Sequence, residues 1–234
     1  MSTRMRDFLF FQSSLSRYVL FRILYRMQFL MLGFYQDAKT IAFLRSIYAE
    51  TRLIQKPFEA FLLYELARAQ SSIDGAMAEV GMYAGATAKI ICSVKGNRAF
   101  YGFDTFAGLP APQEIDMQYA GNSSIKENNY SAAKDQVSQY LHAYPDVHLT
   151  QGLFPQSADG MTFPPFSFVH LDVDHYTGTK ESLIWFWKRM MEKGVIVIHD
   201  SHFPGVRKAI EEFSDGVTPR PRCFHNASQA ILLT

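Results

Sequence analysis

The sequence predicts an α/β fold in which a doubly wound, mostly parallel sheet carries helices on both faces. Two observations predict it. From residue 56 to residue 213, short apolar segments alternate with segments of helical periodicity, the order typical of a parallel sheet. The chain then ends in two short segments with no helix between them, 222–226 and 229–234, which predict an antiparallel hairpin. With 234 residues, 48% of them hydrophobic, the chain can bury one sizeable core.

The elements of the first half follow from local signals. A helix is expected over 57–70, because proline is favoured in the first turn of a helix and the apolar residues after Pro57 recur at helical spacing. The elements expected next are a strand over 76–80, a glycine-containing turn over 81–85, a helix over 86–94 and a strand over 99–104.

The second half begins with a segment over 107–130 that is rich in Pro, Gly, Asn and Ser. It is longer than most loops of compact domains, so we expect it to serve as a lid over a binding site, with Tyr119 and Asn122 as contacts to a substrate. The elements expected after it are a helix over 132–144, strands over 147–152 and 166–174, a helix over 180–194, a strand over 195–200 and a helix over 205–213.

The first 36 residues carry five arginines and one aspartate, a net charge of +4, while the rest of the chain carries −3. They contain no uncharged apolar run of about 18 residues, so we expect no membrane-spanning helix, and they show no signal-peptide pattern. Two interpretations remain: a basic helix on a membrane surface, or a helical arm over 1–50 that packs on a domain over 51–234 or on a second subunit of a homo-oligomer. Packing is favoured, because apolar residues nearly encircle the helix.

Charge and cysteine content exclude some partners and compartments. The net charge of the chain is only +1, which gives no case for nucleic acid as a partner. Cys92 and Cys223 lack the spacing of metal ligands and lie in apolar or aromatic surroundings. We therefore expect a protein of the reducing cytoplasm.

Acids and histidines follow two of the expected strands. Asp172, Asp174 and His175 end one of them, and His199 and Asp200 end the next. The carboxyl ends of parallel strands are where α/β sheets bind ligands. Asp172 and Asp174 alternate along the chain, so both can serve one site only if the chain turns after Val173. The pattern predicts a metal and a general base at this edge, although the carboxylates could instead cap the next helix.

A second set of residues at the same edge predicts a nucleoside site. The turn from Glu79 to Gly85 joins the first strand to its helix, where the backbone and the helix N-terminus favour an anionic ligand. Its spacing departs from the dinucleotide pattern G-x-G-x-x-G. Asp104 ends the second strand, where an acid commonly binds a ribose diol, and the third strand ends at Gln151 and Gly152. Either acid alone could equally be a helix cap or an ion-pair partner.

Five segments stand in a characteristic order: EVGMYAGATAKII, YGFDTFAGLP, GLFPQS, FVHLDVDHY and GVIVIHDSHFPGVRKAIEEF. In order and spacing they resemble the macrocin O-methyltransferase (TylF-like) family of class I S-adenosylmethionine-dependent methyltransferases, over roughly residues 50 to 234. The resemblance implies a Rossmann-like sheet of seven strands, S-adenosylmethionine as cofactor and a divalent metal, usually magnesium. It also implies methylation of a hydroxyl on a sugar or natural product.

The resemblance implies a role for each matching residue. Asp172 and Asp200 become metal ligands, and Asp174 becomes the general base. His175 is a further catalytic candidate, although the family more often has an apolar residue at its position. Glu79, Gly81 and Gly85 are expected at the methionine end of the cofactor, Asp104 at the ribose, and Gln151 and Gly152 near the adenine. The complete expected set around the cofactor is Glu79, Gly81, Tyr83, Gly85, Asp104, Thr105, Phe106, Gln151, Gly152 and Asp172.

The chain departs from the family pattern at His199, where the best-known members carry an acid. As a ligand, this imidazole leans the metal preference from magnesium toward manganese, iron or zinc; it could also be a core residue that binds no metal. His175 and His202 could contribute acid–base chemistry near neutral pH or serve no catalytic role. N-methylation of an amide-like or amine acceptor, a metal-dependent hydroxylase and a non-catalytic protein are the alternatives on the same scaffold.

Overall fold

The computed structural model describes residues 14–51, 55–118, 126–226 and 228–234. Its seven-stranded sheet has the order β3-β2-β1-β4-β5-β7-β6. Five strands are parallel: β1 (Ala76–Val80), β2 (Phe100–Asp104), β3 (Val147–Gln151), β4 (Phe166–Leu171) and β5 (Met190–Ile198). The last two, β6 (Arg222–His225) and β7 (Ala230–Leu233), form the antiparallel hairpin that pairs with β5. The fold class predicted from the sequence is confirmed.

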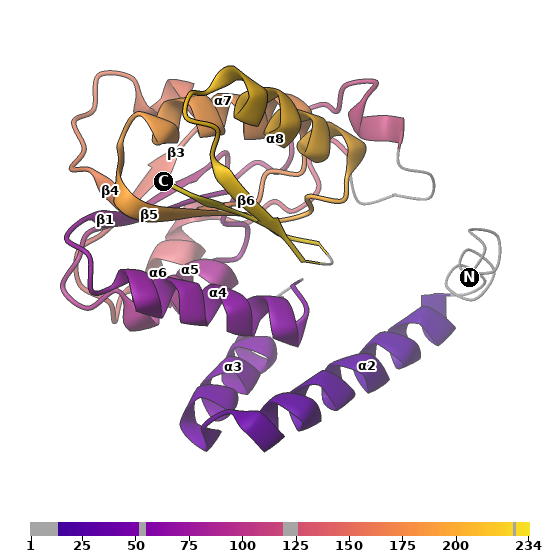
Figure 1. Cartoon of the computed structure of the whole chain (residues 1–234). Helices are drawn as coiled ribbons and strands as arrows, with labels where there is room; N and C mark the ends of the chain where they lie inside the picture. The colour runs from indigo at the N-terminus through magenta and orange to yellow at the C-terminus, as the bar shows by residue number, and fades with distance from the viewer. Residues whose placement is uncertain (1–13, 52–54, 119–125, 227) are drawn as a thin grey trace.

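Helices cover both faces of this sheet (Figure 1). One layer holds α4 (Pro57–Gln70), α5 (Ala86–Val94) and α6 (Lys134–Leu141), and the other holds α7 (Tyr176–Trp187) and α8 (Pro204–Gly216). The strands between the layers are buried on both faces: β1 and β4 have no exposed residue. Their near-continuous apolar sequence is what a parallel sheet of this kind requires.

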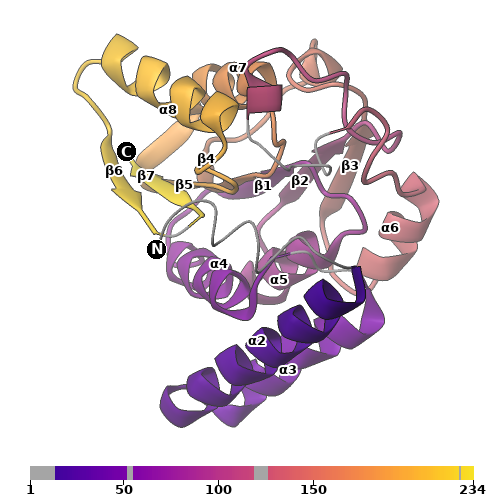
Figure 2. The same ribbon diagram turned by 90° about the vertical axis from the view of Figure 1, so that its right-hand side faces the viewer.

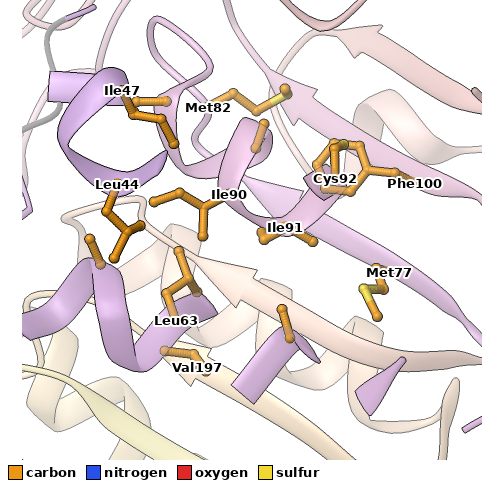
Figure 3. Close-up of a cluster of buried hydrophobic side chains, with 14 of the residues drawn as sticks. Leu44, Ile47, Leu63, Met77, Met82, Ile90, Ile91, Cys92, Phe100 and Val197 are labelled. Atoms are coloured by element: carbon orange, nitrogen blue, oxygen red, sulfur yellow. The ribbon is translucent and has the colours of Figure 1, made fainter. Parts of the chain in front are cut away.

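A separate apolar core fills each side of the sheet. The first lies under α4 and α5 and includes Leu63, Ile90 and Phe100, none of which has exposed surface (Figure 3). The second lies under α7 and α8, where Trp185 packs edge-on against Phe154. The two cores fix the sheet from both faces, so the carboxyl ends of its strands form a rigid edge.

The helix predicted over 180–194 is wrong at both ends. It begins four residues earlier, at Tyr176, and ends at Trp187, because the segment from Met190 belongs to β5. The pairing of β5 with β4 is irregular there: Phe166 lies opposite Met190, whereas Phe168 lies opposite Val195. The charged residues Glu192 and Lys193, exposed on this irregular stretch, give it the composition of a helix end. The preceding strand also ends earlier than expected, at Leu171.

The N-terminal arm consists of α2 (Ser14–Tyr35) and α3 (Ala38–Glu50), which lie below the α4 and α5 layer; they diverge from their connecting turn in Figure 1 and overlap in the view of Figure 2. α3 begins where Oδ1 of Asp37 accepts the backbone N–H groups of Lys39 and Thr40, an N-cap. Leu44 and Ile47 of α3 are fully buried in the first core. The expected packing of the arm on the domain is therefore present for the described residues; residues 1–13 lie outside them.

Candidate functional site

A cavity of about 470 Å³ opens at the carboxyl ends of β1, β2, β4 and β5. Ten residues expected at a site from the sequence line it: Gly81, Tyr83, Asp104, Thr105, Gly152, Asp172, Asp174, His175, His199 and Asp200. They come from segments more than 100 residues apart in the chain. The parallel sheet brings them to one edge, as the strand order requires.

Four expected cofactor residues do not line this cavity: Glu79, Gly85, Phe106 and Gln151. Glu79 is fully buried and paired with His170. Gly85 takes a left-handed φ of 79° at the start of α5, and a Cβ there would lie 3.0 Å from the side chain of Val137. Phe106 is buried, and Gln151 is exposed, with its amide 3.4 Å from the carbonyl oxygen of Thr105. These four residues therefore lie outside the wall of the cavity.

At Gly81 a side chain would clash with the backbone of the site. Its φ is +84°, and a Cβ there would lie 2.0 Å from the backbone carbonyl oxygen of Asp172. The first turn after β1 therefore passes directly against the end of β4. Only a residue without a side chain permits this contact, which sets the position of Asp172 relative to the turn.

Asp104 holds three backbone N–H groups. Its Oδ2 accepts from Met82 and Tyr83 at 2.7 and 2.9 Å, and its Oδ1 accepts from Phe106 at 2.6 Å. Burial raises the pKa of Asp104, and these backbone donors oppose that rise. The carboxylate thus joins the loops after β1 and β2, and its Oδ1 also lies 3.5 Å from the hydroxyl of Thr105.

The backbone is left-handed after four strands that frame the cavity. The non-glycine residues with positive φ include Tyr83 after β1, Phe106 after β2, Asp174 after β4 and Asp200 after β5. Each such residue costs on the order of 1 kcal/mol or more. At Asp174, with φ of 61°, the chain makes the turn after Val173 that both aspartates need to serve one site.

Asp172, His199 and Asp200 bring three metal-ligating atoms within 4.8 Å of one another. Nδ1 of His199 lies 3.2 Å from Oδ1 of Asp172 and 3.2 Å from Oδ2 of Asp200. Ligand atoms at right angles around a cation, each about 2.1 Å from it, are about 3.0 Å apart. Among the described residues, neither buried ring nitrogen of His199 has a hydrogen-bond partner. A ring nitrogen in ion-pair contact with two carboxylates is an arrangement that a divalent cation could also occupy.

The charges of this cluster shift the pKa of each member. Burial and the neighbouring charges of Asp200 and Asp172 raise the pKa of Asp174 well above its usual value. Burial alone would lower the pKa of His199, but the two carboxylates raise it well above the usual range. For Asp172, burial would raise the pKa, but the charge and hydrogen bond of His199, the charge of His170 and the amide of Gln55 together lower it. Asp174 is thus the carboxyl with the strongest tendency to hold a proton.

The start of α4 supplies site residues that sequence reasoning missed. Lys56 and Glu59 line the cavity, and Glu59 lies 3.5 Å from Nε2 of His199. Glu59 accepts from the backbone and side chain of Lys56 at 2.7 and 2.6 Å and from the hydroxyl of Ser228. Burial would raise the pKa of Glu59, but His199, Lys56 and Ser228 hold it well below its usual value. The available signal was an acid, Glu59, in the first turn of the helix that begins at Pro57.

Gln55 is a further residue that the sequence did not indicate. Its buried amide lies 3.1 Å from Nε2 of His170 and 3.4 Å from Oδ2 of Asp172. Its backbone carbonyl accepts the hydroxyl of Tyr48 in α3 at 2.6 Å. The helical arm therefore reaches the site through the residue that contacts Asp172.

The described parts of the loop predicted as a lid lie over the cavity. Leu109, Pro110 and Tyr130 line it, and the rings of Tyr83 and Tyr130 meet edge-on at 5.6 Å. Buried Asp116 anchors the loop: its Oδ1 accepts the backbone N–H of Tyr176 at 2.8 Å, at the start of α7. Tyr119 and Asn122, expected as acceptor contacts, lie outside the described residues.

Comparison with known proteins gives one family and many similar folds. The model of the family described as macrocin-O-methyltransferase (TylF) matches residues 64–218. No curated protein matches significantly. CalS11, a calicheamicin methyltransferase, has a TM-score of 0.70 at 15% identity, covering 100% of this chain and 96% of its own. The O-methyltransferase NovP has a TM-score of 0.67 at 14% identity, covering 79% and 83%.

A third similar structure carries a bound cofactor. TomG from Streptomyces achromogenes, an O-methyltransferase involved in tomaymycin synthesis, was solved in complex with S-adenosylmethionine. Its TM-score is 0.59 at 12% identity, covering 91% of this chain and 97% of its own. At such identities these three structures establish a shared fold; the family match rests on the sequence itself.

Proposed function

Because the chain belongs to the macrocin-O-methyltransferase (TylF) family and is an S-adenosylmethionine-dependent methyltransferase, we propose that it methylates a hydroxyl of a sugar or other small natural product. One observation carries the proposal: Asp172, Asp174, His199 and Asp200 converge in one cavity. CalS11 is described as a TDP-rhamnose 3'-O-methyltransferase, which makes a sugar the first acceptor class to test.

S-adenosylmethionine is proposed to occupy the half of the cavity formed after β1, β2 and β3. Gly81 and Tyr83 lie in the first turn, where backbone N–H groups at the start of α5 favour the cofactor's carboxylate. The carboxylate of Asp104, which lines this half of the cavity, accepts a ribose hydroxyl. Thr105 and Gly152 complete this half of the wall. Glu79 and Gly85 support the turn from behind.

Asp174 is the proposed general base. A neutral hydroxyl is a weak nucleophile, so the site must orient it and remove its proton. The acceptor oxygen gives its proton to the carboxylate of Asp174 and forms a bond to the methyl carbon. The bond between that carbon and sulfur breaks, and its electron pair stays on sulfur, leaving S-adenosylhomocysteine. A cation held by Asp172 and Asp200 would offset the charges that raise the pKa of Asp174, so that Asp174 could accept the proton as a carboxylate.

Asp172, His199 and Asp200 are proposed to hold a divalent cation, magnesium or, given the imidazole, manganese or another transition metal. When bound, such a cation lowers the pKa of a hydroxyl that contacts it. Glu59 faces the other ring nitrogen of His199 and orients the imidazole. His175, whose pKa is lowered by burial, lines the same cavity beside Asp174 and contacts the acceptor as a neutral imidazole.

Calorimetry with S-adenosylmethionine and S-adenosylhomocysteine tests the cofactor site. We expect micromolar or tighter binding, and complete absence of binding would contradict the proposal. Methyl transfer is then measured as S-adenosylhomocysteine release with TDP-deoxysugars, phenols and amines as acceptors. Asp174→Asn should abolish transfer while cofactor binding survives, because asparagine tolerates the left-handed φ of 61° at this position. Turnover of amines alone would favour N-methylation.

Manganese binding, followed by electron paramagnetic resonance, tests the metal site separately. Asp200→Asn should weaken binding at least tenfold. Asp146→Asn is the matched control, because Asp146 also has a positive φ of 54° and lies 2.7 Å from His148, away from the cavity. Equal binding by both variants, or full activity after exhaustive chelation, would contradict metal assistance. Cofactor binding without any methyl transfer would favour a non-catalytic protein.

A further inference from the structure

Tyr48 joins the N-terminal arm to the segment that leads into the site. It lies in α3, and its hydroxyl donates to the backbone carbonyl oxygen of Gln55 at 2.6 Å, two residues before α4 begins. The side chain of Gln55 extends from this backbone into the interior, where the residue is only 2% exposed. The hydrogen bond from Tyr48 therefore fixes the point from which a buried amide reaches the site.

Two aromatic rings of α2 pack against Tyr48. Tyr25 and Phe29 lie one helical turn apart, and both meet the ring of Tyr48 edge-on, with centroids 5.6 and 5.3 Å away. Among the described residues no helix, α2 included, has the length and apolar character needed to cross a membrane. These ring contacts hold Tyr48 in place, so its hydroxyl keeps a defined direction toward Gln55.

The amide of Gln55 has two hydrogens and two acceptors for them. Its Nε2 lies 3.1 Å from Nε2 of His170 and 3.4 Å from Oδ2 of Asp172. Nδ1 of His170 lies 2.6 Å from Glu79, and a proton on Nδ1 leaves Nε2 as an acceptor for the amide. The second amide hydrogen then goes to Asp172. A fixed histidine on one side thus sets the direction in which the amide donates on the other.

Asp172 connects these contacts to the candidate metal ligands. Its Oδ2 faces Gln55, whereas its Oδ1 lies 3.2 Å from Nδ1 of His199. A donor to one oxygen of a carboxylate orients the other oxygen, and contacts of this kind behind a metal ligand tune its affinity for the metal. A displacement of the Gln55 amide would therefore turn the carboxylate away from His199.

We propose that Tyr48 is a positioning residue of the metal site: it fixes the backbone of Gln55, whose amide orients Asp172. This inference rests on the metal site of the proposed function. It makes the N-terminal arm a part of that site, although no described residue of α2 or α3 lines the cavity.

Manganese binding without cofactor or acceptor, followed by electron paramagnetic resonance, tests the proposal. Tyr48→Phe keeps the ring and removes only the hydroxyl, and it should weaken binding about fivefold, within the range that one hydrogen bond contributes. The matched control is Tyr140→Phe, which removes a hydroxyl that also joins the domain to α3, through Oε2 of Glu50 at 3.0 Å. This control should bind manganese as the wild type does. Circular dichroism checks that both variants are folded.

A double variant separates positioning from stability. Gln55→Leu removes the amide, so adding Tyr48→Phe should cause no further loss of manganese affinity, although urea unfolding should still show a loss of stability. The proposal is overturned if Tyr48→Phe binds as the control does, or if it weakens binding equally with and without the Gln55 amide. If the wild type binds no manganese, the proposed metal site fails and this inference fails with it. A failure confined to Tyr48→Phe leaves the metal site standing.

Discussion

Nδ1 of His170 lies 2.6 Å from Oε1 of Glu79, and neither side chain has any exposed surface. The pair joins β1 to β4 directly beneath the site, one residue before the end of each strand. Glu79 Oε2 has no hydrogen-bond partner among the described residues, and burial raises the pKa of this carboxyl. A buried polar pair therefore lies beneath the site, at positions where apolar side chains would also fit.

His170→Leu should destabilise the protein by about 3 kcal/mol, because it leaves a carboxyl buried without its partner. The double variant Glu79→Leu/His170→Leu removes both polar groups and should recover part of that loss. Urea unfolding measures both. A double variant less stable than His170→Leu would show that the pair contributes to stability beyond satisfying its own members.

Gln55→Leu should weaken manganese binding about tenfold, since side chains behind metal ligands typically contribute this much. Its amide lies 3.4 Å from Oδ2 of Asp172 and helps to orient that carboxylate. The control is Gln70→Leu, which removes another buried amide, one that donates to the carbonyl oxygen of Lys193 near the amino end of β5. Similar metal affinity in the two variants would assign Gln55 a structural role alone.

Gly81→Ala should cost more than about 2 kcal/mol, because the left-handed backbone alone disfavours a side chain by about 1–2 kcal/mol. The new Cβ would also meet the carbonyl oxygen of Asp172. Gly216→Ala at the end of α8 has no heavy atom within 4 Å of its Cβ and should change stability by less than about 1 kcal/mol. Chemical denaturation compares them, and cofactor calorimetry should show a loss in Gly81→Ala only.

Cys92 should be inert in the folded protein. Burial raises the pKa of its thiol to about 12 from an ordinary 9.0, so at pH 8 about one thiol in ten thousand is ionised. In a Cys223→Ser background, Ellman's reagent should label Cys92 far more slowly in the native protein than after denaturation. The native labelling rate should rise about tenfold per pH unit without a plateau up to pH 10. Rapid native labelling with a plateau near pH 9 would contradict this pKa.

Much of the fold could be predicted because its signals are local. Alternating apolar strands and periodic helices fix the layers, and the strand ends at Asp172 and Asp200 point to one edge. Errors arose where one segment carries two signals: Met190 to Gly194 has a helix-like composition, yet pairs as a strand. The difference lies in long-range pairing with Phe166, which no local window contains.

Site residues that directly follow strands could be predicted from the sequence. Those contributed by α4 and the terminal hairpin could not. Glu59 reaches His199 from a helix 140 residues earlier, and Ser228 reaches Glu59 from the terminal hairpin. Their positions depend on how α4 packs on the sheet. Glu79 was expected beside the cofactor because it follows the family pattern, yet the same strand position points its side chain into the interior.

Asp116 constrains how this enzyme can change its acceptor over evolution. Its carboxylate fastens the covering loop to Tyr176, two residues after Asp174, and Gly205 leaves room for it where a Cβ would lie 2.1 Å from Oδ1. A mutation that reshapes the loop for a bulkier acceptor should also displace the segment that carries the proposed base, Asp174. Variants with a different acceptor specificity are therefore expected to carry substitutions on either side of position 116 and to retain Asp116 itself.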